Sequence, residues 1–416
     1  MPMKTDNLII TGARIVTPLG FKARKGREMN ELYDEVGTVE ITEGKITYVG
    51  PDRPTLPEGY KVIHGRGRVV LPGFVDSHTH FVFGGFRSEE FLWRLNGDTY
   101  MSILRRGGGI LSTVRATREI SAKLLRNKAE WFIAAMSRMG ITTVEGKSGY
   151  GLDRDTEVKQ LEVMQSVNLD PIRKIDIVPT FLGAHAVPEE YKDRADDYID
   201  FLIKEMLPLV KHRMLAENCD IFCEEGVFTV EQSRRLLKAA QEMGFGAKIH
   251  ADEMVSFGGA ELAGELHALS ADHLLHASDA GIRSLADNDV VATLLPLTAF
   301  TLREPYARGR EMIDNGCAVA LATDLNPGSC CSGSIPLTFA LACIYMHLSV
   351  AEAITALTLN GAAAVNRADT IGSIEVGKYG DIVLLEADTP NALPYYTGMN
   401  TVSLTVKRGR IVSRRR

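Results

Sequence analysis

The sequence lacks the features that would tie a protein to a membrane or to an export pathway. Its 416 residues contain no apolar run of the ~20 residues that a helix needs to cross a bilayer. Residues 1–6 do not begin a charged stretch followed by a long apolar segment, which is the pattern of a secretory signal. We therefore expect a soluble protein that resides in the cytoplasm.

Cysteine frameworks and basic stripes are also absent. The six Cys residues include the adjacent Cys330 and Cys331 and the pair Cys219 and Cys223, but no Cys-x-x-Cys motif. This pattern argues against a disulfide scaffold or a zinc ribbon and predicts reduced thiols. The formal net charge is −6, without a sustained basic stripe, so we expect neither a nucleic-acid nor a membrane partner.

What the sequence does have is a pair of histidines at the end of an apolar strand. The run 71–80 ends in His78 and His80, and residues i and i+2 of a strand point to the same side. His250 and Asp324 also follow short apolar, strand-like runs. One buried His alone is more often a hydrogen-bonded core residue, but the complete set favours a metal. Three imidazoles and one carboxylate suit zinc or iron, so we predict that these four residues bind a metal ion.

The middle of the chain is patterned as a barrel. Strand-like and helical stretches alternate about eight times, as in a parallel sheet with crossover helices. Polar residues follow the candidate strands in turn, in the segments 78–80, 142–150, 178–185, 220–225, 250–253, 271–273, 292–296 and 324–329. Reactive residues at strand carboxyl ends are how a (β/α)8 barrel builds its active site. We therefore predict an α/β fold with a TIM-like (β/α)8 barrel over residues 71–365.

Both chain ends are patterned as short strands separated by turns that contain Gly and Pro. The candidate strands are 8–16, 38–41, 45–49, 61–71, 381–385 and 402–407. We predict that residues 1–70 and 366–416 combine into one small β-sandwich domain. The charged segment 22–35 is expected to be an insertion loop or a short helix on that domain.

The predicted site is suited to hydrolysis. A metal ion lowers the pKa of a bound water from 15.7 towards roughly 7. Glu253 lies three residues after His250 and can turn back past the strand end as an acid/base that moves a proton to a leaving nitrogen. His273 can polarise the attacked carbonyl, or it can merely satisfy a buried backbone group. The sequence leaves open whether Glu253, Asp324 or His273 is the general base.

At these residues the chain resembles the amidohydrolase superfamily, whose metal site uses a His-x-His, one or two further His and an Asp at strand ends. Additional motifs resemble the imidazolonepropionase family in particular. They are the segments 78–91, 106–110, 113–118, 145–152, 181–186, 270–274 and 324–329. This resemblance, which runs along nearly the whole barrel, implies hydrolytic ring opening of 4-imidazolone-5-propanoate to N-formimidoyl-L-glutamate, the third step of L-histidine degradation.

The resemblance also implies a set of substrate-binding residues: Arg87, Tyr150, His185, Glu253, Asn326, Gly328 and Ser329. An Arg can meet the propionate with two parallel charge-assisted bonds, but whether Arg87 holds the carboxylate or the ring stays open. The structural alternative for Arg87 is an ion pair with Glu89 or Glu90, and the alternative for Tyr150 is a partly buried aromatic.

Many superfamily members bridge two metals with a carboxylated lysine on the fourth strand, whereas the matching stretch here, 222–226, has no Lys. We therefore expect one Zn²⁺ or Fe²⁺/Fe³⁺ per subunit, and the resemblance implies a homodimer. Cys330 and Cys331 depart from the family, which more usually has Ser and a small polar residue there. We expect inert, packed thiols, with sensitivity to oxidants as the alternative.

Two other functions stay open. A heterocycle deaminase, or another cyclic amide or amidine hydrolase of the superfamily, also uses a His-x-x-Glu arrangement, and a deaminase would release ammonia. A non-catalytic barrel is expected to have lost metal ligands, and all four are present here. The sequence thus favours the ring-opening hydrolase.

Overall fold

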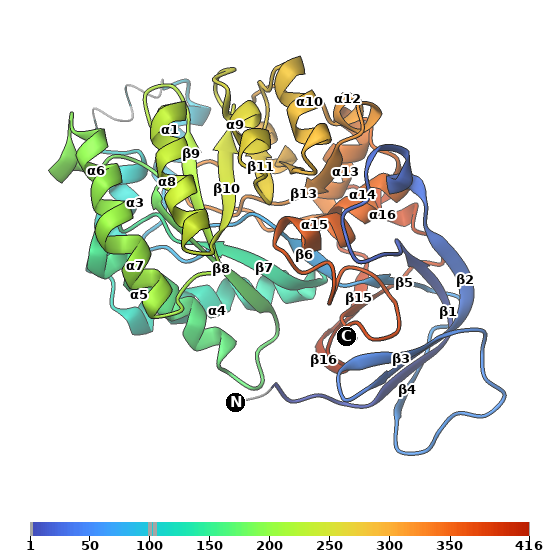
Figure 1. Ribbon diagram of the computed structural model, residues 1–416. Helices are drawn as coiled ribbons and strands as arrows, with labels where there is room; N and C mark the ends of the chain where they lie inside the picture. Colours follow the sequence, from blue (N-terminus) through green and yellow to red (C-terminus); the bar gives the residue numbers. More distant parts are fainter. Residues whose placement is uncertain (1–2, 99–101, 103–105, 416) are drawn as a thin grey trace.

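The structure is a computed structural model that describes residues 3–98, 102 and 106–415. The strands of these residues form two sheets (Figure 1). One is a parallel sheet in which strands that are neighbours in sequence are neighbours in space. Its strands are β6 (Phe74–Asp76), β7 (Ile141–Lys147), β8 (Asp176–Ala184), β9 (Asn218–Cys223), β10 (Gly246–Ala251), β11 (Ser270–His273), β12 (Val291–Leu294) and β13 (Ala318–Leu321). Nearly all of their residues are buried, as expected of parallel strands covered by helices.

Hydrogen bonds just beyond the ends of β6 and β13 close this sheet into a barrel. Thr79 and Leu325 form a parallel bridge. The backbone N–H of His80 donates to the carbonyl of Leu325 at 2.9 Å, and that of Asp324 donates to the carbonyl of His78 at 3.0 Å. The predicted (β/α)8 barrel is therefore confirmed, and its closure joins the two segments that carry predicted metal ligands.

Helices surround the barrel (Figure 1). They are α1 (Ser88–Leu95), α3 (Ile110–Glu119), α4 (Ala122–Arg138), α5 (Arg154–Asn168), α6 (Ala195–Phe201), α7 (Leu207–His212), α8 (Val230–Glu242), α9 (Gly259–Glu265), α10 (Asp279–Asp287), α11 (Pro296–Leu302), α12 (Gly309–Asp314), α13 (Ile335–Tyr345), α14 (Val350–Leu357), α15 (Leu359–Ala364) and α16 (Ala392–Tyr395). Two short 3-10 helices are η1 (Gly26–Asn30) and η2 (Glu189–Tyr191), and a π-helical segment, η3 (Leu202–Met206), joins α6 to α7. Within the described ranges, no helix combines the length and apolar character that a membrane span requires.

Local sequence explains how several of these helices begin. Side chains of Ser, Thr or Asp accept a backbone N–H of the first turn before six helices, at Ser121, Asp153, Thr229, Ser278, Ser334 and Ser349. Such caps satisfy donors that the helix itself leaves unpaired. The helices then bury one apolar face against the barrel in a single large core.

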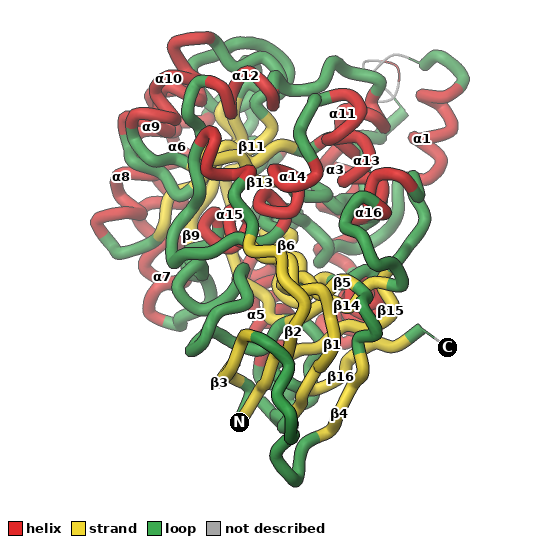
Figure 2. The backbone as a smooth tube through the Cα atoms, turned by 90° about the vertical axis from the view of Figure 1, so that its right-hand side faces the viewer, coloured by secondary structure: helices red, strands yellow, loops and turns green. Residues whose placement is uncertain are grey.

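The chain ends form the second sheet, which Figure 2 shows gathered at one end of the molecule. Its strands are β1 (Leu8–Thr17), β2 (Tyr33–Thr42), β3 (Lys45–Gly50), β4 (Lys61–His64), β5 (Val69–Pro72), β14 (Ile382–Leu385), β15 (Val402–Lys407) and β16 (Arg410–Arg414). The order is β16-β15-β14-β5-β1-β2-β3, with β4 also paired to β1. Apolar residues of β1, β2 and β3 share one core with those of β14 and β15, so the two arms of the sheet enclose a common interior, as expected for a small sandwich.

Two details of this region differ from the sequence-based expectation. The single strand predicted over 61–71 is two strands, because Arg66 and Gly67 take positive φ angles of 56° and 76° and form a turn between them. The predicted short helix in 22–35 exists as η1, but it packs on the barrel. The carbonyl of Met29 accepts a bond from Thr355 of α14 at 2.8 Å, and Asn30 donates to Glu352 at 2.7 Å.

A partly buried ion-pair cluster joins the two sheets. Asp176, at the start of β8, lies 2.8 Å from Lys407 Nζ and 2.8 Å from Arg408 Nη2, both at the end of β15. Lys407 Nζ also lies 2.6 Å from Asp381, which precedes β14. The division into 71–365 and the composite 1–70 plus 366–416 stays a prediction.

Candidate active site

Closure of the barrel places the predicted metal ligands together. His78 and His80 directly follow β6, and Asp324 follows β13, on the two segments that the closing hydrogen bonds join. His250 lies near the end of β10. All four residues are buried, with at most 2% of their surface exposed. The barrel thus collects three imidazoles and one carboxylate in one buried place.

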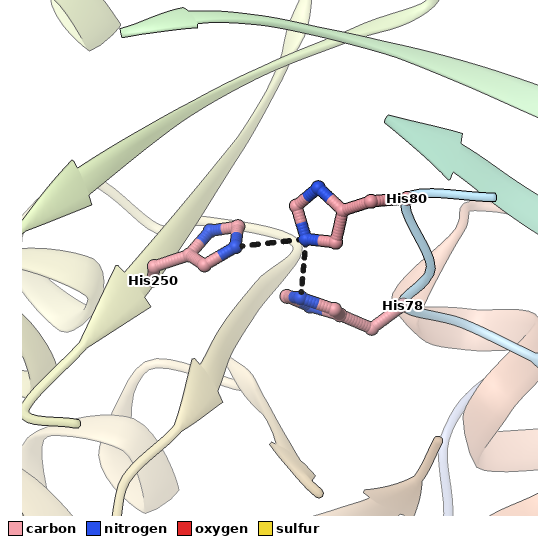
Figure 3. Close-up of side chains that lie close together, drawn as sticks. All are labelled: His78, His80 and His250. Carbon is pink, nitrogen blue, oxygen red and sulfur yellow. Dashed lines mark hydrogen bonds between the residues drawn. The ribbon is translucent and has the colours of Figure 1, made fainter. Parts of the chain in front are cut away.

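The inner nitrogens of the three imidazoles face one another (Figure 3). His80 Nε2 lies 3.3 Å from His78 Nε2 and 3.3 Å from His250 Nε2. Asp324 Oδ1 lies 3.6 Å from the Nε2 atoms of both His78 and His80. Ligands held tetrahedrally at about 2.0–2.1 Å from a zinc ion lie ~3.3 Å from each other. The donor atoms are therefore spaced as a metal ion requires.

Carboxylates behind two of the rings fix the direction of these nitrogens. His78 Nδ1 lies 2.6 Å from Asp272 Oδ2, and His250 Nδ1 lies 3.0 Å from Asp220 Oδ2. Such a partner keeps the proton on Nδ1 and leaves the Nε2 lone pair for a metal. Burial lowers the pKa of His78 well below its ordinary value, so its ring is neutral. Convergent lone pairs repel unless a cation lies between them, which means that the residues present fit a metal ion.

Glu253 and His273 lie beside this cluster. Glu253 Oε1 is 3.5 Å from His273 Nδ1. The backbone N–H groups of Glu253 and Met254 both donate to Glu224 Oε2 at 2.9 Å, which anchors the loop after β10. Burial raises the pKa of Glu253 to about 8, and the negative charges of Asp324 and Glu224 add to this rise. Glu253 is thus a partly buried carboxyl group whose pKa lies near neutrality, as a proton-transfer group requires.

Tyr150 and His185 form an aromatic wall next to His80. The rings of His185 and His80 stack with centroids 5.0 Å apart and an interplanar angle of 18°. The Tyr150 ring lies 5.9 Å from His80 and 5.2 Å from His185. His185 Nδ1 donates to the Gly149 carbonyl at 3.0 Å, so its Nε2 is an acceptor. The structure therefore brings both predicted substrate-binding residues to the metal cluster.

Arg87 is held by the ion pair that the sequence left as an alternative. Its Nε and Nη2 atoms each lie 2.8 Å from Glu90 Oε2. Its remaining Nη1 faces the loop after β13, since a Cβ built on Gly328 would lie only 2.3 Å from it. Arg94, which the sequence analysis did not single out, donates to the Gly328 carbonyl at 2.6 Å. Two guanidinium groups thus meet at the loop that carries the predicted substrate-binding residues Asn326, Gly328 and Ser329.

Asn326 organises that loop. Its Nδ2 donates to the Asp324 carbonyl at 2.7 Å and to Ser329 Oγ at 2.8 Å. Its Oδ1 accepts the backbone N–H groups of Gly328 and Ser329, both at 2.8 Å. Both the oxygen and the nitrogen of this amide are engaged, so Asn326 fixes the positions of Gly328 and Ser329 next to the predicted metal ligand Asp324.

Four charged residues that lie below the histidines could not be assigned a role from the sequence: Lys147, Asp220, Lys248 and Asp272. All four are 0% exposed. The signal that could have revealed them is charge at alternate positions of otherwise apolar strands, as in Glu145-x-Lys147 of β7 and Lys248-x-His250 of β10. Residues two apart face the same side of a strand, so these charges share the barrel interior with the predicted metal ligands.

The two unusual thiols differ from each other. Cys330 is buried, its Sγ lies 3.4 Å from the Thr323 carbonyl, and burial raises the pKa of its thiol, which makes it unreactive. Cys331 is exposed. Sensitivity to oxidants therefore stays a prediction for Cys331, whereas Cys330 is the packed, inert thiol that we expected.

Comparison with known proteins agrees with this arrangement. The family model described as the amidohydrolase family matches residues 69–412. The imidazolonepropionase of Phocaeicola vulgatus is 73% identical over 410 residues, which cover 98% of this chain and 99% of the relative. The imidazolonepropionase of Clostridium tetani is 54% identical over 416 residues, with 99% of each chain covered.

Among solved structures, the 5-methylcytosine deaminase of Klebsiella pneumoniae, liganded with phosphonocytosine, superposes with a TM-score of 0.73 over 98% of each chain. Its sequence identity is 17%, so this likeness shows the fold alone. The full-length relatives and the family model, by contrast, show kinship in sequence. The chain therefore belongs to the amidohydrolase family and, within it, to the imidazolonepropionases.

Proposed function

We propose that this protein hydrolyses 4-imidazolone-5-propanoate to N-formimidoyl-L-glutamate, the third step of L-histidine degradation. The observation that carries the choice of substrate is the 73% identity to the Phocaeicola vulgatus imidazolonepropionase over 98% of this chain. The cluster of three imidazoles and one carboxylate supports the hydrolytic chemistry independently.

The metal ligands in this proposal are His78, His80, His250 and Asp324, with one Zn²⁺ or one iron ion per chain. When bound, the ion supplies a Lewis acid that lowers the pKa of water to roughly 7. A single ion is favoured because the strand-four carboxylate of Glu224 is already used by the backbone N–H groups of residues 253 and 254.

Glu253 is the proposed acid/base. Water adds to the ring carbonyl carbon, and the proton it loses passes to the Glu253 carboxylate. The same residue gives a proton to the ring nitrogen as the C–N bond breaks. A pKa of about 8 makes both transfers accessible near neutral pH. His273, 3.5 Å away, steadies the oxyanion of the tetrahedral intermediate. Asp324 is less suited than Glu253 to the acid/base role, because its second oxygen already accepts a hydrogen bond from Thr298 at 2.7 Å.

Substrate recognition is assigned to the two sides of the cluster. Tyr150 and His185 flank the imidazolone ring, next to His80. Arg87 directs its Nη1 to the propionate, which lies against the backbone of Gly328 and Ser329. Glu90 pairs with one edge of the Arg87 guanidinium, which leaves the other edge to bond the substrate carboxylate. Glu90 also balances one of the two positive charges that Arg87 and Arg94 bring to this loop.

Product analysis tests the function. The metal-loaded protein is mixed with freshly generated 4-imidazolone-5-propanoate, and N-formimidoyl-L-glutamate and ammonia are measured in the same samples. We expect formimidoylglutamate without ammonia, and its loss in Glu253→Gln. Ammonia release would instead support a heterocycle deaminase, whose fold this chain shares. Absence of both products would assign the site to another cyclic amide or amidine.

We further propose that the protein acts as a cytoplasmic homodimer on this small molecule alone, without nucleic acid or membrane. Light scattering coupled to size-exclusion chromatography tests the dimer. A mass of one chain, 45.6 kDa, at micromolar concentration would contradict it.

A further inference from the structure

Beneath the metal ligands lies a closed network of five charged side chains from four strands: Glu145 and Lys147 of β7, Asp220 of β9, Lys248 of β10 and Asp272 of β11. All of them are 0% exposed. Fully buried charges are rare unless they are paired, and each is expensive to maintain. The network sits directly behind the rings of His78 and His250 and has no part in the proposed chemistry.

Lys147 is the centre of this network. Its Nζ lies 2.6 Å from Asp220 Oδ2, 3.0 Å from Glu145 Oε2 and 3.4 Å from Asp272 Oδ2. An ammonium group has three N–H donors, so it can serve all three carboxylates. Burial alone would lower the pKa of Lys147, but the three carboxylates outweigh burial and raise it, so the group stays charged.

The oxygens that Lys147 holds are the same ones that face the metal ligands. Asp220 Oδ2 lies 3.0 Å from His250 Nδ1, and Asp272 Oδ2 lies 2.6 Å from His78 Nδ1. One ammonium therefore fixes both carboxylates at once, and through them two imidazoles from opposite sides of the cluster.

Lys248 is equally buried but is bound differently. Its Nζ donates to Ser270 Oγ at 2.7 Å and to the Ala364 carbonyl at 3.1 Å. Its nearest carboxylate oxygens are more distant, at 3.5 Å for Glu145 and 3.8 Å for Asp272. The two lysines thus carry the same charge in the same network, while only Lys147 makes close contact with the carboxylate behind His250.

We propose that Lys147 is a positioning residue for the metal site: by clamping Asp220 and Asp272, it orients His250 and His78 and thereby sets the affinity for the metal ion. The inference rests on the metal site of the proposed function. It predicts that loss of Lys147 weakens metal binding. Electrostatics alone predicts the opposite, because removal of a buried positive charge should strengthen the binding of a divalent cation.

The test compares Lys147→Met with Lys248→Met, which remove the same charge and leave side chains of similar volume. Each metal-free protein is titrated with Zn²⁺ in competition with a chromophoric chelator, after circular dichroism has established that it is folded. We expect Lys147→Met to bind zinc roughly 10- to 100-fold more weakly than the unaltered protein, the usual effect of losing support behind a ligand. Lys248→Met should bind zinc as tightly or more tightly.

Equal zinc affinities in the two variants would overturn the inference, since the network would then act only through its net charge or its packing. If Lys147→Met does not fold, the double variant Glu145→Gln/Lys147→Met removes the ammonium without leaving an additional buried negative charge. Zinc binding by that variant as tight as in the unaltered protein would also overturn the inference. Failure of the unaltered protein to bind zinc or iron would instead contradict the proposed function.

Discussion

At the scale of single residues, the site depends on which atom of each polar group is already engaged. His185 uses Nδ1 on the Gly149 carbonyl, and Arg87 uses two of its nitrogens on Glu90. Each therefore has one defined atom left to bind substrate, Nε2 for the imidazole and Nη1 for the guanidinium. Pre-set side chains of this kind reduce the ordering that substrate binding would otherwise require.

Arg87→Lys tests the residue assigned to the propionate. Lys lacks the planar fork that can hold Glu90 with one edge and a carboxylate with the other. Loss of a hydrogen bond between charged groups corresponds to about 1.5–3 kcal/mol, so we expect KM to rise roughly 10- to 100-fold, with the metal content unchanged. Steady-state kinetics and metal analysis measure both. Arg126→Lys, in an exposed pair with Glu130, is the control, and an unchanged KM in Arg87→Lys would remove Arg87 from recognition.

The sequence predicted which residues the barrel would bring together, but not all of what they do. His78, His80, His250 and Asp324 could be found because each follows an apolar strand, and their role as ligands stays a prediction. The carboxylates of Asp220 and Asp272 could not be assigned, because their partners come from other strands. Likewise, the bonds of Asn326 within its own loop depend on the turn it makes, which a motif does not specify.

At the scale of elements, strand ends and their glycines shape the candidate active site. Gly149, just after β7, has a φ of 103°, and a Cβ there would lie 2.9 Å from both His185 Nδ1 and the Leu182 carbonyl. The position thus needs glycine for its backbone conformation and for the close approach of His185. The helix-forming and strand-forming pattern of the sequence predicted these elements, whereas the turn at 65–68 that divides β4 from β5 was missed.

Gly149→Ala tests this contact. The added methyl group should displace His185 from the ring of His80, and misplacement of a substrate-positioning group by about 1 Å can cost up to 100-fold. We expect kcat/KM to fall roughly 10- to 100-fold, while zinc affinity is retained. Gly226→Ala is the matched control, because Gly226 also has a positive φ of 78° but has no atom within 4 Å of the added Cβ. Equal losses in both variants would mean that backbone strain, not the His185 contact, explains the effect.

At the scale of the whole molecule, the cluster around Asp176 joins the barrel to the sheet of the chain ends. Burial raises the pKa of Asp176, but the charges of Lys407, Arg408 and Arg173 outweigh it and hold the pKa well below its ordinary value. A carboxylate with a lowered pKa stabilises the folded protein above the pKa of the unfolded chain, about 3.9. That stability is lost as the pH falls through the lower pKa of the folded state.

Asp176→Asn should therefore lower Tm at pH 7, and the difference from the unaltered protein should narrow as the pH falls below about 4. Thermal unfolding followed by circular dichroism between pH 7 and pH 3 measures it. Asp196→Asn is the control, because the side chain of Asp196 is 72% exposed in its pair with Arg235. A difference that is independent of pH would show that the charge of Asp176 does not stabilise the contact between the sheets.

We expect hydrolysis to require one metal ion, held by His78, His80, His250 and Asp324. The most direct measurement is to titrate the metal-free protein with Zn²⁺, and separately with Fe²⁺ under anaerobic conditions, while bound metal and formimidoylglutamate formation are recorded together. We expect activity to rise in proportion to bound metal and to saturate at about one ion per chain. In His80→Ala, added metal should produce neither stoichiometric metal binding nor formimidoylglutamate formation. Full activity in protein without bound metal would contradict the account.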